Sequence, residues 1–161
     1  MKILKTVLSA FSILILCTNL KAYESPPQKD IYQIKVYRMK TSEQLIQVDS
    51  FLKNAYLPAL HRLGISQVGV FKNLGIDTAG EKAIYVLIPL HSLEQLSKIE
   101  DGLGKDKDYI KAGATYLNVP YNSPAYTRIE TIVLRAFNNM PHFQSPSLKG
   151  EVAERVYELR S

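Results

Sequence analysis

DIYQIKVYRMKTSEQLIQVDSFLKNAYLPALHRLGISQVGVF, residues 30–71, carries the pattern that decides the fold. Its first ten residues alternate with a period of two, which predicts a strand with one buried face. One face carries Tyr32, Ile34 and Val36, and the other carries Gln33, Lys35 and Tyr37. The remainder of the stretch predicts a long helix followed by a second strand.

The predicted helix has a clear start, stop and apolar face. Thr41 or Ser42 can cap it and Gly64 can end it. Apolar residues recur at spacings of three and four, so that one stripe faces a sheet, at Leu45, Val48, Leu52, Ala55, Ala59 and Leu63. Pro58 removes a backbone hydrogen bond, so we expect a kink that bends the turn carrying His61 and Arg62.

The later residues predict the rest of one domain. Strands are expected over 65–74, 82–90 and 125–137. A helix capped by Ser92 is expected to turn Leu93, Leu96 and Ile99 inward, to be interrupted over 100–108 and to continue to Leu117. The order β-α-β-β-α-β predicts the α+β class and a ferredoxin-like domain with an antiparallel sheet. Residues 82–90 are apolar on both sides of the strand, so both faces of the sheet need cover.

Length and charge exclude some classes of protein. A chain of 161 residues that is 46% hydrophobic and 22% charged can form one ordinary domain with a real core. The net charge of +5 includes three lysines within residues 1–22. Without them, 17 basic side chains stand against 15 acidic ones, which argues against a nucleic-acid partner.

Residues 1–22 resemble a secretory signal peptide, with two early lysines, an apolar run and Ala22 at the expected cut. We therefore expect an exported protein, periplasmic or extracellular, with no stable membrane insertion after cleavage. An uncleaved anchor and a lipid-modified Cys17 are the alternatives. Cys17 is the only cysteine, so cleavage would leave no thiol for disulfides or catalysis.

The sequence also indicates how the chain is divided. Residues 23–29 are an extended lead-in, residues 30–137 the predicted domain, and residues 138–153 a linker. The pentapeptide VYELR at 156–160 repeats the pattern of IYQIK at 31–35. Residues 154–161 are therefore predicted to be the first strand of a truncated second domain.

These motifs resemble the NIPSNAP family of the dimeric α/β-barrel superfamily. The residues that carry the likeness are IYQIKVY at 31–37, YLPALHRLGI at 56–65, KAGATYLN at 111–118, AYTRIE at 125–130 and VYELRS at 156–161. The chain is most similar to the first domain of bacterial two-domain members. The resemblance implies a barrel of two sheets, whose second half is a tandem domain or a homodimer partner. It implies no catalytic residues, because the family has no agreed set.

Few side chains suggest a site. The three histidines are far apart in sequence and lack metal-ligand spacing, so neither a metal site nor another cofactor is expected. Tyr37, His61 and Tyr85 are the candidate ligand-binding residues, around a cavity between the sheet and the end of the first helix, with His61 at its mouth.

Two classes of function remain. The first is a non-catalytic assembly or small-ligand-binding module, whose ligand is a small hydrophobic or aromatic molecule. The alternative is a cofactor-independent monooxygenase-like or haem-handling enzyme, which needs an acid-base residue or an iron ligand in the barrel. The first is favoured because only His61 could serve as that residue. Because both sheet faces need cover, the chain is expected to dimerise through its sheets or to aggregate.

Overall fold

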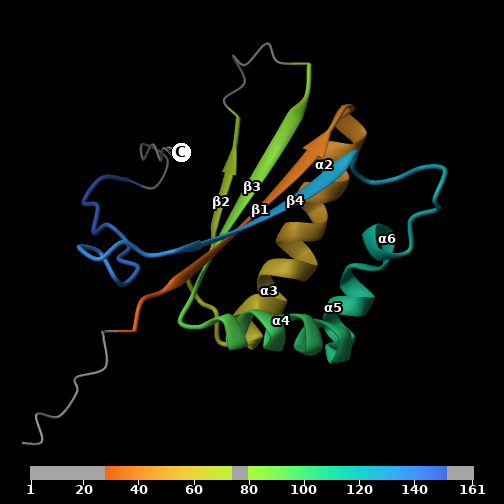
Figure 1. The fold of residues 1–161 in the computed structure, drawn as a ribbon. Helices are drawn as coiled ribbons and strands as arrows, with labels where there is room; N and C mark the ends of the chain where they lie inside the picture. Colours follow the sequence, from red (N-terminus) through yellow and green to blue (C-terminus); the bar gives the residue numbers. More distant parts are fainter. Residues whose placement is uncertain (1–27, 74–79, 152–161) are drawn as a thin grey trace, which may run out of the picture.

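The computed structural model describes residues 28–73 and 80–151. Four strands form one antiparallel sheet in the order β2-β3-β1-β4 (Figure 1). The strands are β1 (Ile31–Met39), β2 (Gly69–Lys72), β3 (Lys82–Leu90) and β4 (Arg128–Arg135). This topology confirms the predicted α+β class and the ferredoxin-like order of elements.

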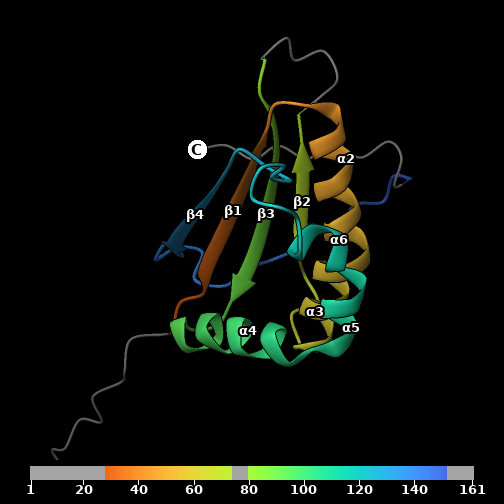
Figure 2. The ribbon, with the colours of Figure 1, turned by 90° about the vertical axis from the view of Figure 1, so that its right-hand side faces the viewer.

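The helices all lie on one side of this sheet (Figure 2). Between β1 and β2 run α2 (Ser42–Phe51), the π-helical turn η1 (Leu52–Tyr56) and α3 (Leu57–Arg62). Between β3 and β4 run α4 (Leu93–Lys105), α5 (Lys107–Ala112) and α6 (Ala114–Leu117). The core lies between the sheet and this helical layer.

The first helical run begins and ends where the sequence predicts. The Thr41 hydroxyl accepts from the Gln44 amide at 3.2 Å, and the Gln44 side chain accepts in return from the Thr41 amide, which completes a capping box. Gly64 follows the helix with a φ of +84°, in the left-handed region that favours glycine. Pro58 lies at the start of α3, directly after the π-helical turn η1, and the kink expected there stays a prediction.

The register of the strands decides which side chains face the helices. On β1 the helix side receives Gln33, Lys35 and Tyr37, and it receives the even-numbered residues of β3. Tyr32, Ile34 and Val36 point away from the helices, on what we call the outer face. The helices therefore cover the more polar of the two β1 faces, and the more apolar one remains outside.

Several predicted boundaries differ from the observed ones. The second strand begins at Gly69 rather than at residue 65, and the fourth spans 128–135 rather than 125–137. The interruption expected over 100–108 is present but shorter than predicted, because α4 continues to Lys105 and buries Leu103. Leu93, expected to face inward, is exposed in the first turn of α4. The break falls at Asp106, whose carboxylate accepts from the Tyr109 amide at 2.9 Å and caps α5.

Part of the predicted linker packs against the sheet. We call residues 141–146 the strap. The Asp30 amide donates to the Pro141 carbonyl at 2.8 Å, and the Phe143 ring meets the Tyr32 ring edge-on at 6.3 Å on the outer face. In Figure 1 the dark-blue segment that follows β4 runs toward the β2 side of the sheet. The predicted signal peptide and the predicted strand at 154–161 lie outside the described residues. The domain boundaries therefore stay predictions.

Candidate functional site

The outer face of the sheet is an apolar surface that the helices leave uncovered, and the strap lies over part of it, where Phe143 meets Tyr32. Its apolar members come from all four strands and are Tyr32, Ile34, Val36, Gly69, Phe71, Ala83, Tyr85, Leu87, Ile132 and Leu134. Exposure is greatest on β4, where Ile132 is 41% and Leu134 46% exposed. Isolated exposed apolar residues are ordinary, but a continuous sheet face of this composition marks an interaction surface.

One end of the outer face is charged. Arg38 donates from Nε to Glu130 at 2.6 Å and from Nη1 to Glu81 at 3.0 Å. Arg128 lies 3.5 Å from the same Glu130 carboxylate. These contacts join β1, β4 and the residue before β3 in a polar border beside the apolar surface, an arrangement typical of the rim of a protein interface.

A second candidate region lies on the opposite side of the sheet. We call it the lysine–tyrosine cluster, and its members are Gln33, Lys35, Tyr37, Tyr56, Tyr109 and Tyr116. Lys35 reaches from the centre of β1 and its Nζ lies 5.4 Å from the centroid of the Tyr56 ring, close enough for a cation–π contact. Tyr56 comes from η1, so the π-helical turn positions this ring over the sheet.

Burial governs the protonation of this cluster. It lowers the pKa of the Lys35 amine, and the nearby charge of Glu100 opposes that effect. Burial also raises the pKa of the Tyr37, Tyr56 and Tyr116 hydroxyls far above the ordinary range, so these groups stay protonated at neutral pH. The cluster can therefore supply hydroxyl donors and one cationic donor.

Two polar atoms in the cluster have no hydrogen-bond partner among the described residues. They are Oε1 of Gln33 and the hydroxyl of Tyr56, and both are buried. Buried polar atoms are normally paired, because an unpaired one costs about 1–3 kcal/mol. Both atoms belong to residues on the helix side of the sheet, as Lys35 does, and both lack the partner that buried polar atoms normally have.

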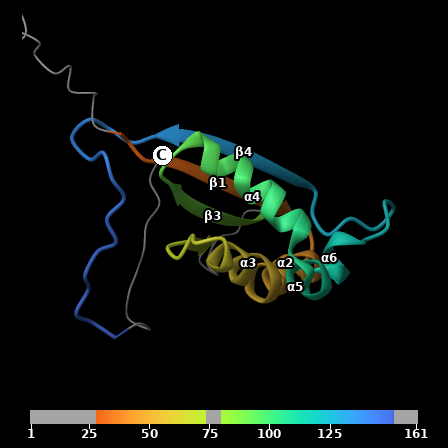
Figure 3. The ribbon, with the colours of Figure 1, turned by 90° about the horizontal axis from the view of Figure 1, so that it is seen from below.

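The strip of β4 next to Lys35 is exposed on the helix side of the sheet. Lys35 pairs in register with Thr131, and Gln33 pairs with Val133. Thr131 and Val133 point to the helix side of the sheet, yet both are exposed. In Figure 3, β4 lies on the far side of β1 from α2, α3 and α5. The helical layer therefore leaves this strip of the sheet uncovered beside the lysine.

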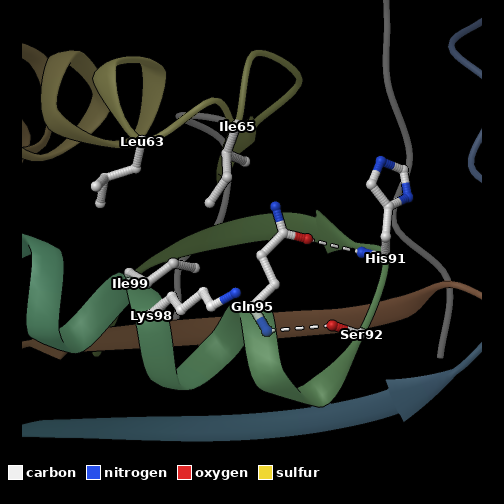
Figure 4. A pocket seen from close by; sticks show the side chains of 7 residues that line it. All are labelled: Leu63, Ile65, His91, Ser92, Gln95, Lys98 and Ile99. Atoms are coloured by element: carbon white, nitrogen blue, oxygen red, sulfur yellow. Dashed lines mark hydrogen bonds between the residues drawn. The ribbon is translucent and has the colours of Figure 1, made fainter.

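A cavity of about 380 Å³ lies where the end of the first helical run meets the start of α4 (Figure 4). It is lined by Leu63, Ile65, His91, Ser92, Gln95, Lys98 and Ile99. The Gln95 side chain is fixed there, because its Oε1 accepts from the His91 amide at 2.9 Å. This cavity lies near the end of the first helical run, but none of Tyr37, His61 and Tyr85 lines it.

The structure does not bring the three predicted ligand-binding residues together. Tyr37 is 3% exposed and faces the helices, within the lysine–tyrosine cluster. Tyr85 lies on the outer face, because it pairs in register with Val36 rather than with Tyr37. His61 is exposed in the last turn of α3 and does not line the cavity shown in Figure 4. A role in binding for any of the three stays a prediction.

Sequence reasoning missed Lys35, Gln33 and Tyr56 as site residues. The alternation of β1 did place Gln33 and Lys35 together on one face, but it could not show that this face lies under the helices. The available signal was a lysine in the middle of a strand whose other face is apolar. Tyr56 became relevant only through the π-helical turn, which the sequence did not predict.

Across residues 28–73 and 80–151, no three His, Cys, Asp or Glu side chains are arranged so that they could hold a metal ion. In the same ranges, no helix is long and apolar enough to cross a membrane.

Comparison with known proteins identifies the fold. No protein-family model and no curated protein sequence matches the chain. A NIPSNAP family protein of unknown function from Agrobacterium tumefaciens C58 has a similar structure, with a TM-score of 0.52 and 12% identity over 73% of this chain and 94% of that chain. A second NIPSNAP family protein from the same strain gives a TM-score of 0.52 and 14% identity over 71% and 91%.

The chain therefore has a ferredoxin-like α+β fold. More particularly, the fold is similar to that of NIPSNAP family proteins, which confirms the resemblance inferred from the sequence motifs. At these identities the likeness concerns the fold alone.

Proposed function

We propose that this protein is a non-catalytic module that pairs with a second copy through the outer face of the sheet and binds a small ligand in each half. The observation that carries the proposal is the apolar outer face. Burying one side chain the size of Ile132 or Leu134 contributes about 1.5–3 kcal/mol. A stable interface buries about 800 Å² on each partner, which is of the order that one face of a four-stranded sheet can supply.

A second copy is the partner that fits the observed surface. Two antiparallel sheets can pack face to face at about 10 Å, with their inner side chains interdigitated. The border formed by Arg38, Glu81 and Glu130 contains both signs of charge, so two copies related by a two-fold axis can match opposite charges at the rim. A tandem domain of the same fold would use the same surface.

The ligand-binding part of the proposal rests on the lysine–tyrosine cluster. It lies on the helix side of the sheet, so a sheet-to-sheet dimer would not cover it. The unpaired Gln33 and Tyr56 atoms supply the polar groups that orient a small ligand, and the aromatic rings supply apolar contact. We also propose that the module is exported, on the basis of the signal-like residues 1–22.

Two substitutions on neighbouring residues of β4 test the assembly. Ile132 faces outward and is 41% exposed, whereas Val133 faces the helix side and is 44% exposed. Ile132→Glu would place a charge in the proposed interface, and we expect it to weaken dimerisation about 100-fold or more. Val133→Glu, the matched control, should leave the dimer intact. Light scattering and sedimentation over a range of concentrations would measure both variants.

A wild-type chain that stays monomeric at every concentration would contradict the assembly. Equal weakening by Ile132→Glu and Val133→Glu would also contradict it, because the outer face would then have no special role.

A further inference from the structure

We propose that one corner of the domain docks on the surface of an anionic lipid membrane, with its apolar side chains in the headgroup layer and two cationic side chains beside the lipid phosphates. We call this surface the basic corner, and it consists of Lys29, Leu93, Arg135, Phe137 and Met140. Neither the proposed dimer nor the proposed ligand site uses these residues. The inference therefore goes beyond the proposed function and does not depend on it.

Three elements meet at the basic corner. The first residues of β1 and of α4 lie beside the last residues of β4 (Figure 2). Lys29 and Arg135 line a hollow of about 410 Å³ together with Leu93. The same two residues line a second hollow, of about 770 Å³, together with Phe137 and Met140. The two hollows share both cations, so the apolar residues on either side belong to one continuous surface.

The apolar members of the basic corner are exposed. Phe137 is 83% exposed, Leu93 56% and Met140 55%. Phe137 and Met140 flank a two-residue turn, in which the Met140 amide donates to the Phe137 carbonyl at 3.2 Å across Asn138 and Asn139. A turn that projects an aromatic ring and a methionine can place both side chains in an apolar layer while its polar backbone stays at the level of the headgroups.

The two cations supply the charge that an anionic surface attracts. Neither Lys29 nor Arg135 forms an ion pair with a carboxylate of the described residues. The acidic residues beside them in the fold are already engaged, because Asp30 is buried against two histidines and Glu94 is paired with Lys98 at 2.9 Å. Each lysine or arginine close to an anionic membrane strengthens binding about fivefold.

A lipid surface fits this combination better than other partners do. A second copy of the chain would bring the same two cations against each other, and like charges oppose association. A nucleic acid offers phosphates but no apolar layer for the exposed side chains. An anionic bilayer presents phosphates above hydrocarbon, so it matches both the charge and the apolar character of the corner.

The course of the chain supports the same orientation. Gln28 lines the hollow that contains Leu93, so the residues before it join the domain at the basic corner. The apolar run of the signal-like segment covers residues 7–17, and only residues 18–27 separate it from Gln28. A membrane that receives this run during export would therefore be tethered to the domain at this corner.

Vesicle binding tests the inference on the soluble protein recovered from the periplasm or medium. The probes are vesicles of phosphatidylcholine alone and vesicles that also contain about 30% phosphatidylglycerol. Flotation should show binding to the anionic vesicles that is at least about tenfold stronger than binding to the neutral ones. High salt should weaken the binding, because it screens the charges of the lipid surface.

Two variants locate the contact. Phe137→Ser should weaken binding to the anionic vesicles about tenfold, because it removes one apolar side chain from the headgroup layer. Arg135→Gln should weaken it about fivefold and reduce its dependence on salt. Tyr121→Ser is the control for the first variant, because Tyr121 is fully exposed in the loop at the opposite end of β4. Lys53→Gln, which changes an exposed lysine of η1, is the control for the second. Both controls should bind as the wild type does.

Equal binding to the neutral and the anionic vesicles, or no binding to either up to about 5 mM lipid, would overturn the inference. So would a loss in Tyr121→Ser as large as that in Phe137→Ser, because the contact would then lie elsewhere. Light scattering on Phe137→Ser should give the mass of the wild type, and a change in mass would count against the inference by placing Phe137 in the dimer interface. A wild-type monomer that binds the vesicles through Phe137 and Arg135 would contradict the proposed assembly but support the basic corner.

Discussion

Asp30 connects three separate parts of the chain at a single buried carboxylate. Its Oδ2 accepts from the Phe143 amide at 2.7 Å, and its Oδ1 lies 3.1 Å from His91 Nδ1 and 3.4 Å from His142 Nδ1. Burial alone would raise the pKa of Asp30, but these three partners together hold the pKa below its usual value. The ionised carboxylate therefore stabilises the attachment of the strap.

Asp30→Asn should weaken this attachment. Because the pKa of Asp30 is lowered on folding, its contribution is present at neutral pH and is lost as the pH falls below about 4. At pH 7 we expect the variant to have a free energy of unfolding lower by about 1–3 kcal/mol. Below pH 4 the difference from the wild type should shrink. Urea unfolding across this pH range measures it.

The exposed Asp101 on α4 provides the control for that experiment. Asp101→Asn should have little effect at either pH, since surface substitutions usually change stability by less than about 0.5 kcal/mol. A gap between wild type and Asp30→Asn that is the same at pH 7 and pH 3 would show that the charge of Asp30 is not what holds the strap.

At the residue scale, the sequence could predict which side chains share a face, but not what covers that face. The alternation of β1 groups Gln33, Lys35 and Tyr37 correctly. Both faces of the sheet carry apolar residues, however, so the pattern cannot say which one the helices choose. The prediction that Tyr37 and Tyr85 lie around one cavity has a related weakness. The structure places them on opposite faces, because the antiparallel register between β1 and β3 depends on the whole sheet.

At the scale of elements, the docking of α5 and α6 depends on a glycine that has no room for a side chain. A Cβ on Gly113 would lie 2.9 Å from the Tyr109 carbonyl oxygen and 3.3 Å from the Phe51 ring. Gly113→Ala should therefore destabilise the fold by about 1–3 kcal/mol, because a backbone oxygen cannot move aside easily. Thermal or urea unfolding would measure the loss.

Gly104 provides a control of opposite sign. It lies inside α4, and a Cβ there would meet nothing within 4 Å. Gly104→Ala should stabilise the protein by about 0.5–1 kcal/mol, since alanine loses less conformational entropy in a helix than glycine does. Changes of the same sign in both variants would mean that local helix propensity, and not the packing around Gly113, decides the outcome.

The elements themselves were largely predictable, and the errors have local physical causes. The helix from Thr41 to Gly64 has a capping box, a regular stripe and a terminal glycine, so its limits were readable. The glycines at 102 and 104 suggested a break in α4. Burial of Ile99 and Leu103 outweighs that weak preference, and the helix continues to the residue that Asp106 caps.

At the scale of the whole molecule, the fold was predictable because the strand and helix patterns agree along the full domain. Assembly and export were less predictable, because they depend on a partner and on residues outside the described ranges. The export proposal concerns the intact polypeptide. We expect the protein recovered from the periplasm or medium to begin at Tyr23, which intact mass would show. Soluble exported material that retains Met1 would contradict cleavage.

The contacts of Asp30 also determine how this unit can be joined to others. Its carbonyl accepts from the Ala136 amide at 2.9 Å, so the first residue before β1 is hydrogen-bonded to the first residue after β4. The polypeptide thus enters and leaves the sheet at one corner, and the strap then stays attached to that corner through Asp30. A guest domain with adjacent termini can be placed within a loop of a host protein without forcing the two sides of that loop apart. The same geometry suits tandem repeats, because each copy would be connected to its neighbours at a single corner.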